Sequence, residues 1–232
     1  MMLLLLLVVL ELNYFKMGIV KFSKKFLKAH PNLYNVADDK ILNKIVYYII
    51  DSKYRKSVKL TRWLNEQVLN PSQKLLNIAN TIKNGDYDKQ VVQVLIWVKR
   101  NLKYTSDKKA WNMNEKWATA NQIVETLRDD CDGGAVLTYV LCRLKGVPSN
   151  RLYVFAGNVE YNGSTSGHCW LGYKPTQYPL NFVFLDWCYY ANNKSVDSRN
   201  KVYIKKRVIE GEPKYKTVWF GFNETKSFRT IN

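Results

Sequence analysis

The chain has 232 residues, of which 47% are hydrophobic and 14% aromatic, and it carries 36 Lys and Arg against 19 Asp and Glu, a net charge of +17. This length and apolar content exclude a disordered chain and suffice for one core with a small helical lobe. The positive charge favours an acidic partner, either nucleic acid or an anionic surface. The alternative is that the lysines are ordinary surface residues exposed to water.

The first 16 residues form an apolar N-terminal segment. This segment is shorter than the about 20 residues that a membrane-spanning helix needs, and it lacks the basic start and cleavage site of a secretory signal. Three interpretations remain open: a membrane-associating end, a weak signal, or an upstream extension of a gene that begins at Met17. Residues 1–28 could contact a membrane, and a solvated arm is the alternative.

Hydrophobic spacing then predicts a series of helices in the first part of the chain. They are expected at residues 38–50, 60–69, 72–82, 88–102, 123–128 and 131–144. After Pro148 the hydrophobic residues recur at every second position, which predicts strands. The strands are expected at residues 151–157, 167–173, 181–188, 201–210 and 215–222. Helices followed by strands indicate an α+β fold with an antiparallel meander. We divide the chain into the segment 1–16, a helical extension 17–70 and a main domain 71–232.

The chain has four cysteines, Cys131, Cys142, Cys169 and Cys188. None forms a CxxC pair, so zinc-ribbon spacing is excluded, and a chain of this size does not need disulfides. We therefore expect reduced thiols and a cytoplasmic protein, or a membrane-associated or exported one if residues 1–16 are genuine. We expect no cofactor and no metal site, because the only histidines, His30 and His168, lie far apart and the thiols are scattered.

Cys131 stands at the predicted start of a buried helix, with Asp129 or Asp130 as the N-cap. In the first helical turn, free backbone N–H groups and the helix dipole favour a thiolate. The glycines that follow, Gly133 and Gly134, would let another group approach this turn closely. The alternative is an inert buried cysteine.

A cysteine nucleophile needs a base, and the base needs a partner that orients it. If Tyr173 pairs with Asn181 across the intervening loop, His168 falls directly opposite Asp186 on the same face of the sheet. Opposed side chains of this kind have Cβ atoms about 5 Å apart. An unpaired Asp186 among its aromatic neighbours would be costly, so we expect it to contact His168.

These residues carry a resemblance over roughly residues 72–190. The matching motifs are Tyr104-Thr-Ser-Asp107, Trp117-Ala-Thr-Ala-Asn-Gln, Asp130-Cys131-Asp132, Gly146-Val147-Pro148, His168-Cys-Trp170 and Leu185-Asp186. The order resembles the transglutaminase-like superfamily, in particular its bacterial and phage cysteine peptidases. The resemblance implies a papain-like core in which the nucleophile starts a helix packed on an antiparallel sheet, with 71–232 as the catalytic domain. It implies Cys131 as nucleophile, His168 as general base and acid, and Asp186 as the orienting residue.

Some positions depart from the family pattern. Asp129 replaces the usual glycine before Asp-Cys, and its charge would raise the pKa of the thiol slightly. Gly133-Gly134 stands where an acid and a larger residue are common. The oxyanion donor is open, and the candidates are the Cys131 backbone N–H and the side chains of Trp111, Trp117 and Gln122.

The implied activity is hydrolysis of peptide or amide bonds in a protein or peptide, through a thioester. Two alternatives stay open: a transglutaminase or amidase that uses the same triad, and a non-catalytic basic module that binds nucleic acid or an anionic surface.

Overall fold

The computed structural model describes residues 52–189, 193–205 and 208–228. The chain divides into two compact units, Met1–Arg55 and Lys56–Asn232, and nearly all described residues belong to the second. The predicted apolar segment 1–16 and the predicted helix 38–50 lie outside the described residues, and so does most of the extension 17–70. The boundary after residue 70 stays a prediction. No described helix combines the length and apolar character that crossing a membrane requires.

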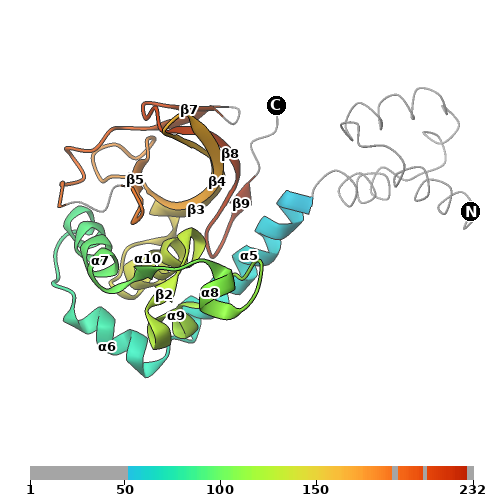
Figure 1. Ribbon diagram of the computed structural model, residues 1–232. Coiled ribbons are helices and arrows are strands. Elements are labelled where there is room, and N and C mark those ends of the chain that lie inside the picture. Colours follow the sequence, from blue (N-terminus) through green and yellow to red (C-terminus); the bar gives the residue numbers. More distant parts are fainter. Residues whose placement is uncertain (1–51, 190–192, 206–207, 229–232) are drawn as a thin grey trace, which may run out of the picture. The chain divides into compact units, whose positions relative to one another are not determined.

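The helical layer is built from the first part of the unit (Figure 1). Its helices are α5 (Ser52–Leu69), α6 (Gln73–Thr81), α7 (Tyr87–Asn101), α8 (Asp107–Trp111), α9 (Ala120–Thr126) and α10 (Cys131–Leu144). Five of the six helices overlap predicted ranges, although α5 begins at Ser52 instead of residue 60 and α9 lies two to three residues earlier than predicted; α8 was not predicted. Side-chain caps explain several starts: Ser72, Asp86 and Thr119 accept hydrogen bonds from the first turns of α6, α7 and α9.

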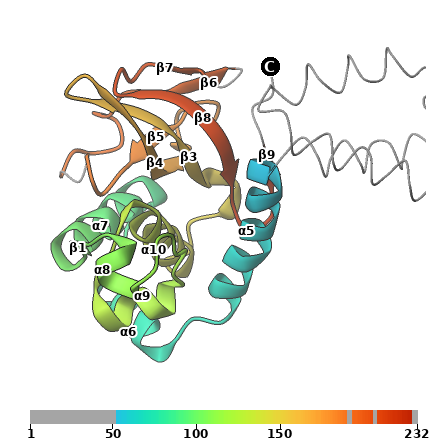
Figure 2. The ribbon, with the colours of Figure 1, turned by 45° about the vertical axis from the view of Figure 1, so that its right-hand side comes forward.

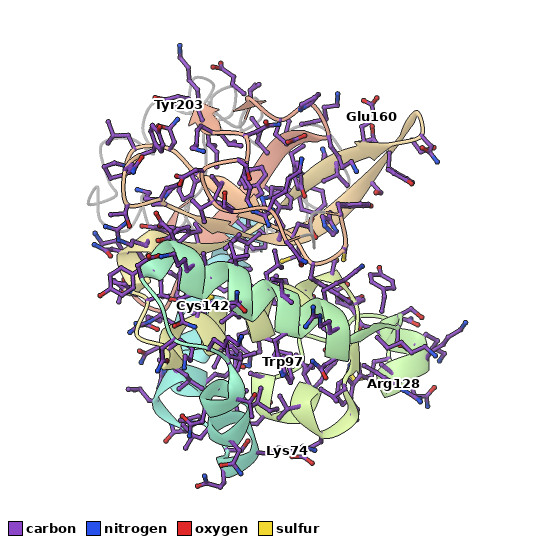
Figure 3. The ribbon with its side chains drawn as sticks, turned by 90° about the vertical axis from the view of Figure 1, so that its left-hand side faces the viewer. Lys74, Trp97, Arg128, Cys142, Glu160 and Tyr203 are labelled. Carbon is purple, nitrogen blue, oxygen red and sulfur yellow. The ribbon has the colours of Figure 1, made fainter. Side chains whose placement is uncertain are left out.

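Helix α10 is the centre of the unit. Every residue from Asp132 to Cys142 is buried, as expected of a helix that is apolar on all sides. It packs on β3 (Leu152–Tyr161) and β4 (Ser164–Tyr173) of the sheet and on α6, α7 and α9 of its own layer. In Figure 3 the two layers are seen edge-on, with Trp97 and Cys142 in the helical layer and Glu160 and Tyr203 in the sheet.

The sheet is antiparallel and curls over the helical layer (Figure 2). Its remaining strands are β5 (Val183–Leu185), β6 (Tyr203–Lys205), β7 (Val208–Glu210), β8 (Tyr215–Phe222) and β9 (Ser227–Phe228). The order is β5-β4-β3-β8-β7-β6, with β9 paired to β8, and a bridge between Phe182 and Val202 links the two ends. The predicted α+β class is confirmed, with helices first and an antiparallel sheet after them.

Two strand predictions are wrong. The strands do not form one meander, because β3 pairs with both β4 and β8 and so joins two three-stranded meanders. The single strand predicted over 201–210 is instead two strands, β6 and β7, that pair with each other. A period of two along one segment cannot distinguish one long strand from a tight pair of short ones.

A short parallel pair that sequence periodicity did not predict lies in the helical layer. Here β1 (Lys103–Tyr104) pairs with β2 (Arg128–Asp129), and the Thr105 N–H donates to the Asp129 carbonyl at 2.9 Å. The pairing brings the residues after α7 beside the start of α10.

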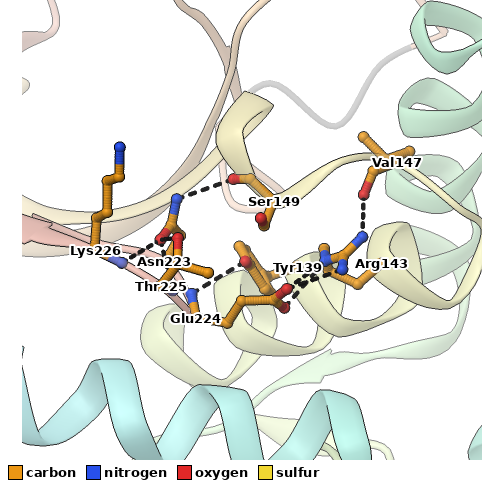
Figure 4. Close-up of polar contacts among 8 residues, drawn as sticks. All are labelled: Tyr139, Arg143, Val147, Ser149, Asn223, Glu224, Thr225 and Lys226. Carbon is orange, nitrogen blue, oxygen red and sulfur yellow. Dashed lines mark hydrogen bonds and ion pairs between the residues drawn. The ribbon is translucent and has the colours of Figure 1, made fainter.

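Polar contacts fasten the turn between β8 and β9 to α10 (Figure 4). The Arg143 guanidinium donates to both carboxylate oxygens of Glu224, at 2.8 to 3.0 Å, and to the Val147 carbonyl at 2.6 Å. The Tyr139 hydroxyl accepts from the Glu224 backbone N–H at 3.2 Å. The side chains of Arg143 and Glu224 are only 22% and 8% exposed, so water could replace the lost partner only poorly, least of all at Glu224.

This burial predicts a large effect of Arg143→Met. We expect the substitution to lower the free energy of unfolding by about 3 kcal/mol, because it leaves Glu224 charged and poorly solvated. Lys74→Met is the matched control, since the Lys74–Glu125 pair is exposed, and it should cost less than about 1 kcal/mol. Urea unfolding measures both, and equal losses in the two variants would contradict the prediction.

Candidate active site

Helix α10 begins at Cys131, as predicted. Asp130 is the N-cap, and its carboxylate accepts from the Asp132 backbone N–H at 3.3 Å. Cys131 is half-buried and packs against the core. The thiol lies beside the Cys169 backbone, on the strand that carries His168; this contact only partly opposes the rise in the pKa of the thiol that burial causes.

The thiol environment differs in one respect from the expectation of a stabilised thiolate. Burial raises the pKa of Cys131 well above its ordinary value, and the neighbouring carboxylates of Asp130 and Asp132 raise it further. Asp129, the predicted source of extra charge, instead accepts from the Trp111 indole N–H and from the Asp130 N–H through the same oxygen. Burial and the neighbouring carboxylates therefore both oppose ionisation of this thiol.

His168 and Asp186 contact each other in the interior of the site. His168 Nε2 lies 2.6 Å from Asp186 Oδ2, and the two side chains are 6% and 0% exposed. Because Nε2 faces the carboxylate, Nδ1 is the ring nitrogen left for another partner. The described hydrogen bonds include none between this ring and the Cys131 thiol. The imidazole ring also contacts Trp170 and Tyr189, which hold its plane.

The strand register that led to this pair was wrong, although the pair itself is present. Tyr173 pairs with Val183, not Asn181, so the strands are offset by two residues from the prediction. His168 and Asp186 are then diagonal instead of directly opposed. An offset of two keeps both side chains on the same face of the sheet, so they still meet.

Asp186 has every oxygen occupied. Oδ2 accepts from His168 and also from the Tyr215 hydroxyl at 2.6 Å, and Oδ1 accepts from the Cys188 backbone N–H at 2.8 Å. The Cys188 thiol, His168 and Asp186 also offer ligand atoms within 4.8 Å of one another. Because both carboxylate oxygens of Asp186 already accept hydrogen bonds, the residue is better suited to orienting an imidazole than to binding a metal. Sequence reasoning missed both contacts with Asp186, because Tyr215 lies on β8, far along the chain, and Cys188 contributes its backbone N–H.

The two glycines after Cys131 admit neighbours as predicted. A side chain at Gly133 would overlap the Asp129 carboxylate, and one at Gly134 would overlap the Trp187 indole. Trp187 directly follows Asp186 and stacks on Tyr104 with ring centroids 5.7 Å apart. Gly134 therefore lets the segment that carries Asp186 lie against the first turn of α10.

The side chains considered as oxyanion donors have other partners. Trp111 donates to Asp129 and Trp117 to Glu115, both at 3.2 Å. The Gln122 amide oxygen accepts from the Thr119 N–H in a capping box at the start of α9. Of the candidates, the Cys131 backbone N–H at the helix start remains.

A family described as "Transglutaminase-like domain" matches residues 73–174. This range includes α10 with Cys131 and the strand with His168. The predicted resemblance to transglutaminase-like proteins is therefore confirmed over residues 73–174. A comparison with curated proteins finds no relative.

Solved structures with a similar fold have low sequence identity. Calcium-bound LapG of Legionella pneumophila is 18% identical with a TM-score of 0.49, over 75% of this chain and 87% of that one. EGTA-treated LapG is 15% identical with a TM-score of 0.48, over 73% and 84%. A protein of Cytophaga hutchinsonii, described as a candidate cysteine protease, is 17% identical with a TM-score of 0.37, over 67% and 44%.

The contact at Gly134 predicts that Gly134→Ala disturbs the packing at the start of α10. We expect a loss of about 1–3 kcal/mol in the free energy of unfolding, because the methyl group displaces the buried indole of Trp187. Gly85→Ala is the control, since its new methyl would meet mainly the flexible Lys89 side chain. Thermal unfolding measures both variants. A Gly134→Ala protein as stable as the control would show that the close approach is dispensable.

Proposed function

We propose that the protein is a cysteine hydrolase that cleaves peptide or amide bonds, with Cys131 as nucleophile, His168 as general base and acid, and Asp186 as the orienting residue. The proposal rests on the buried contact of 2.6 Å between His168 and Asp186. His168 lies on β4, which packs on α10. We assign the catalytic domain to residues 71–232.

The chemistry follows from the orientation of the imidazole. His168 Nδ1 takes the proton of the Cys131 thiol as the sulfur attacks the amide carbonyl, and Asp186 stabilises the imidazolium through Nε2. The imidazolium then protonates the leaving amine, the C–N bond breaks, and a thioester remains. His168 next deprotonates a water molecule that attacks the thioester, which releases the acid and restores the thiol.

A protein or peptide is the substrate that we propose. The transglutaminase-like domain supports acyl-transfer chemistry at a cysteine, and the description of the Cytophaga hutchinsonii protein agrees with a peptidase. Transamidation is the second candidate, because an amine can replace water at the same thioester. Incorporation of dansylcadaverine into casein separates transamidation from hydrolysis.

The non-catalytic alternative rests on the net charge of +17. A basic module would bind DNA or heparin with steep salt dependence, and Cys131→Ala would not change that binding. A non-catalytic binding module does not need a fully buried Asp186 that accepts three hydrogen bonds, one of them from a histidine. That arrangement favours catalysis.

The first test needs no knowledge of the substrate. We expect iodoacetamide to alkylate Cys131 at pH 7 faster than Cys142, Cys169 and Cys188, because His168 accepts the thiol proton. In His168→Ala the rate at Cys131 should fall by about 10²-fold or more. Peptide mass spectrometry assigns the label to each cysteine, and the three other thiols serve as internal controls. Equal rates in the two proteins would show that His168 does not activate the thiol.

Hydrolysis of fluorescently labelled casein gives the matching activity test. Cys131→Ala and His168→Ala should each abolish turnover, and full activity in either would overturn the proposed mechanism.

The hydrogen bonds of Asp186 predict a graded series. Asp186→Asn should reduce kcat by about 10²–10⁴-fold, because the imidazolium loses its counter-charge. Tyr215→Phe removes one donor to Asp186 Oδ2 and leaves the His168 contact, so we expect a loss of roughly tenfold. The kcat of each variant in the casein assay checks the order. A Tyr215→Phe effect as large as that of Asp186→Asn would mean that the hydroxyl has a direct role in the reaction.

A further inference from the structure

A cavity that the proposed mechanism does not use lies beside the candidate active site. Its volume is about 250 Å³, and its walls come from separate parts of the sheet. They include Phe184 of β5, Tyr189 after it, Arg199 and Asn200 before β6, and Glu212 between β7 and β8. Small-molecule sites usually measure about 300–1,000 Å³, so a single amino-acid side chain or a chain end is the better match to this cavity.

The segment that carries Arg199 is held in a fixed shape by a lysine. The Lys201 ammonium donates to the backbone carbonyls of Val196, Asp197 and Arg199 at 2.9 to 3.1 Å. The Arg199 backbone N–H also donates to the Val196 carbonyl at 3.2 Å. Hydrogen bonds from a charged donor are the stronger kind, and three of them act on this one short segment. The wall of the cavity therefore does not depend on a ligand for its shape.

Among the described residues that line the cavity, cationic side chains outnumber acidic ones. The cations are Lys194 and Arg199, and the acid is Glu212, whose carboxylate already accepts from the Asn200 amide at 2.8 Å. Arg199 is 8% exposed, and burial lowers the pKa of its guanidinium, although arginine stays charged at neutral pH. A cation with so little water around it attracts an incoming carboxylate more strongly than an exposed cation does.

Two aromatic residues connect the cavity to the candidate active site. The Tyr189 ring lines the cavity and contacts the His168 imidazole, with ring centroids 5.0 Å apart. Tyr215, whose hydroxyl donates to Asp186, lies close enough to Arg199 to influence its pKa. An extended peptide advances about 3.3–3.6 Å per residue, so a chain that passes His168 reaches the cavity within a few residues.

We propose that this cavity is a specificity subsite that binds a carboxylate of the substrate, within a few residues of the bond that is cleaved. The carboxylate belongs either to an acidic side chain or to the C-terminus of a peptide. Arg199 would hold it through paired N–H donors, and Lys194 adds a second positive charge. A lysine or arginine of the substrate would instead meet two like charges. The inference rests on the proposed hydrolase function, which it deepens by naming a class of substrate.

The first test measures hydrolysis of synthetic peptides. Mass spectrometry of casein digested by the unmodified protein locates a cleaved bond, and peptides around that bond are made with Glu, Gln or Lys at each neighbouring position. We expect kcat/KM for Glu to exceed that for Gln by about tenfold or more at one position, with Lys below Gln. In Arg199→Gln this ratio should approach one. Arg62→Gln is the matched control, because the Arg62 side chain is 88% exposed on α5, and it should keep the full ratio.

Lys194→Gln tests the same subsite at an exposed position, where a substitution leaves the core intact. We expect it to lower the preference for Glu by about two- to fivefold. If Arg199→Gln does not melt cooperatively, Lys194→Gln carries the test.

A second set of the same peptides, with free or amidated C-termini, distinguishes the two sources of the carboxylate. A preference for Glu that Arg199→Gln removes assigns the subsite to a side chain, and a preference for the free end that Arg199→Gln removes assigns it to the chain end. The absence of both preferences in the unmodified protein would overturn the proposal. A preference that stays unchanged in both Arg199→Gln and Lys194→Gln would overturn it as well.

Binding to a protein that cannot cleave separates this inference from the proposed function. Immobilised Cys131→Ala protein selects from a random hexapeptide library, made with free and with amidated C-termini, and mass spectrometry identifies the retained peptides. Peptides with carboxylates should be enriched. Adding Arg199→Gln should remove the enrichment, and adding Arg62→Gln should not. Selection that depends on Arg199, without hydrolysis by the unmodified protein, counts against the proposed function alone. Hydrolysis without a preference for carboxylates counts against this subsite alone.

Discussion

A fully buried carboxylate, Asp186, is the constraint around which the candidate active site is arranged. A charge in that position is tolerable only if hydrogen bonds replace the water it has lost. The donors come from three parts of the sheet: His168 on β4, Tyr215 on β8 and the Cys188 backbone N–H after β5. The curl of the sheet and the order of its strands bring these donors to one point. The same contacts that satisfy the charge fix the imidazole ring.

The first turn of α10 links this pair to the helical layer through two glycines. Gly134 receives the indole of Trp187, the residue after Asp186, and Gly133 receives the carboxylate of Asp129, the residue before the N-cap. A helix with ordinary side chains at these positions would hold both groups away. Glycine is a poor helix former, so helix propensity does not explain Gly133 and Gly134. The groups that pack against the helix start explain them.

Sequence reasoning reached much of the fold because the strongest signals were local. Helical periodicity and caps located α10 and most other helices, and the change to period two located the sheet. It brought His168 to Asp186 even with the register wrong by two residues, because only the parity of the register decides the face of a strand. It failed where pairing is not local. The contact between β3 and β8, the Tyr215 hydroxyl on Asp186 and the parallel pairing of β1 with β2 all join segments far apart in the chain.

The gathering of acids beside the start of α10 could not be predicted from the sequence. Asp107 lies 22 residues before Asp129 with no motif between them, and only the fold brings the two together. In a chain with a net charge of +17, five acids (Asp107, Glu115, Asp129, Asp130 and Asp132) lie close enough that each raises the pKa of Asp132 or is Asp132 itself. Burial, helped by mutual repulsion, raises the pKa of Asp129 to about 6 and that of Asp132 to about 9. The start of α10 therefore carries less negative charge than the sequence alone suggests.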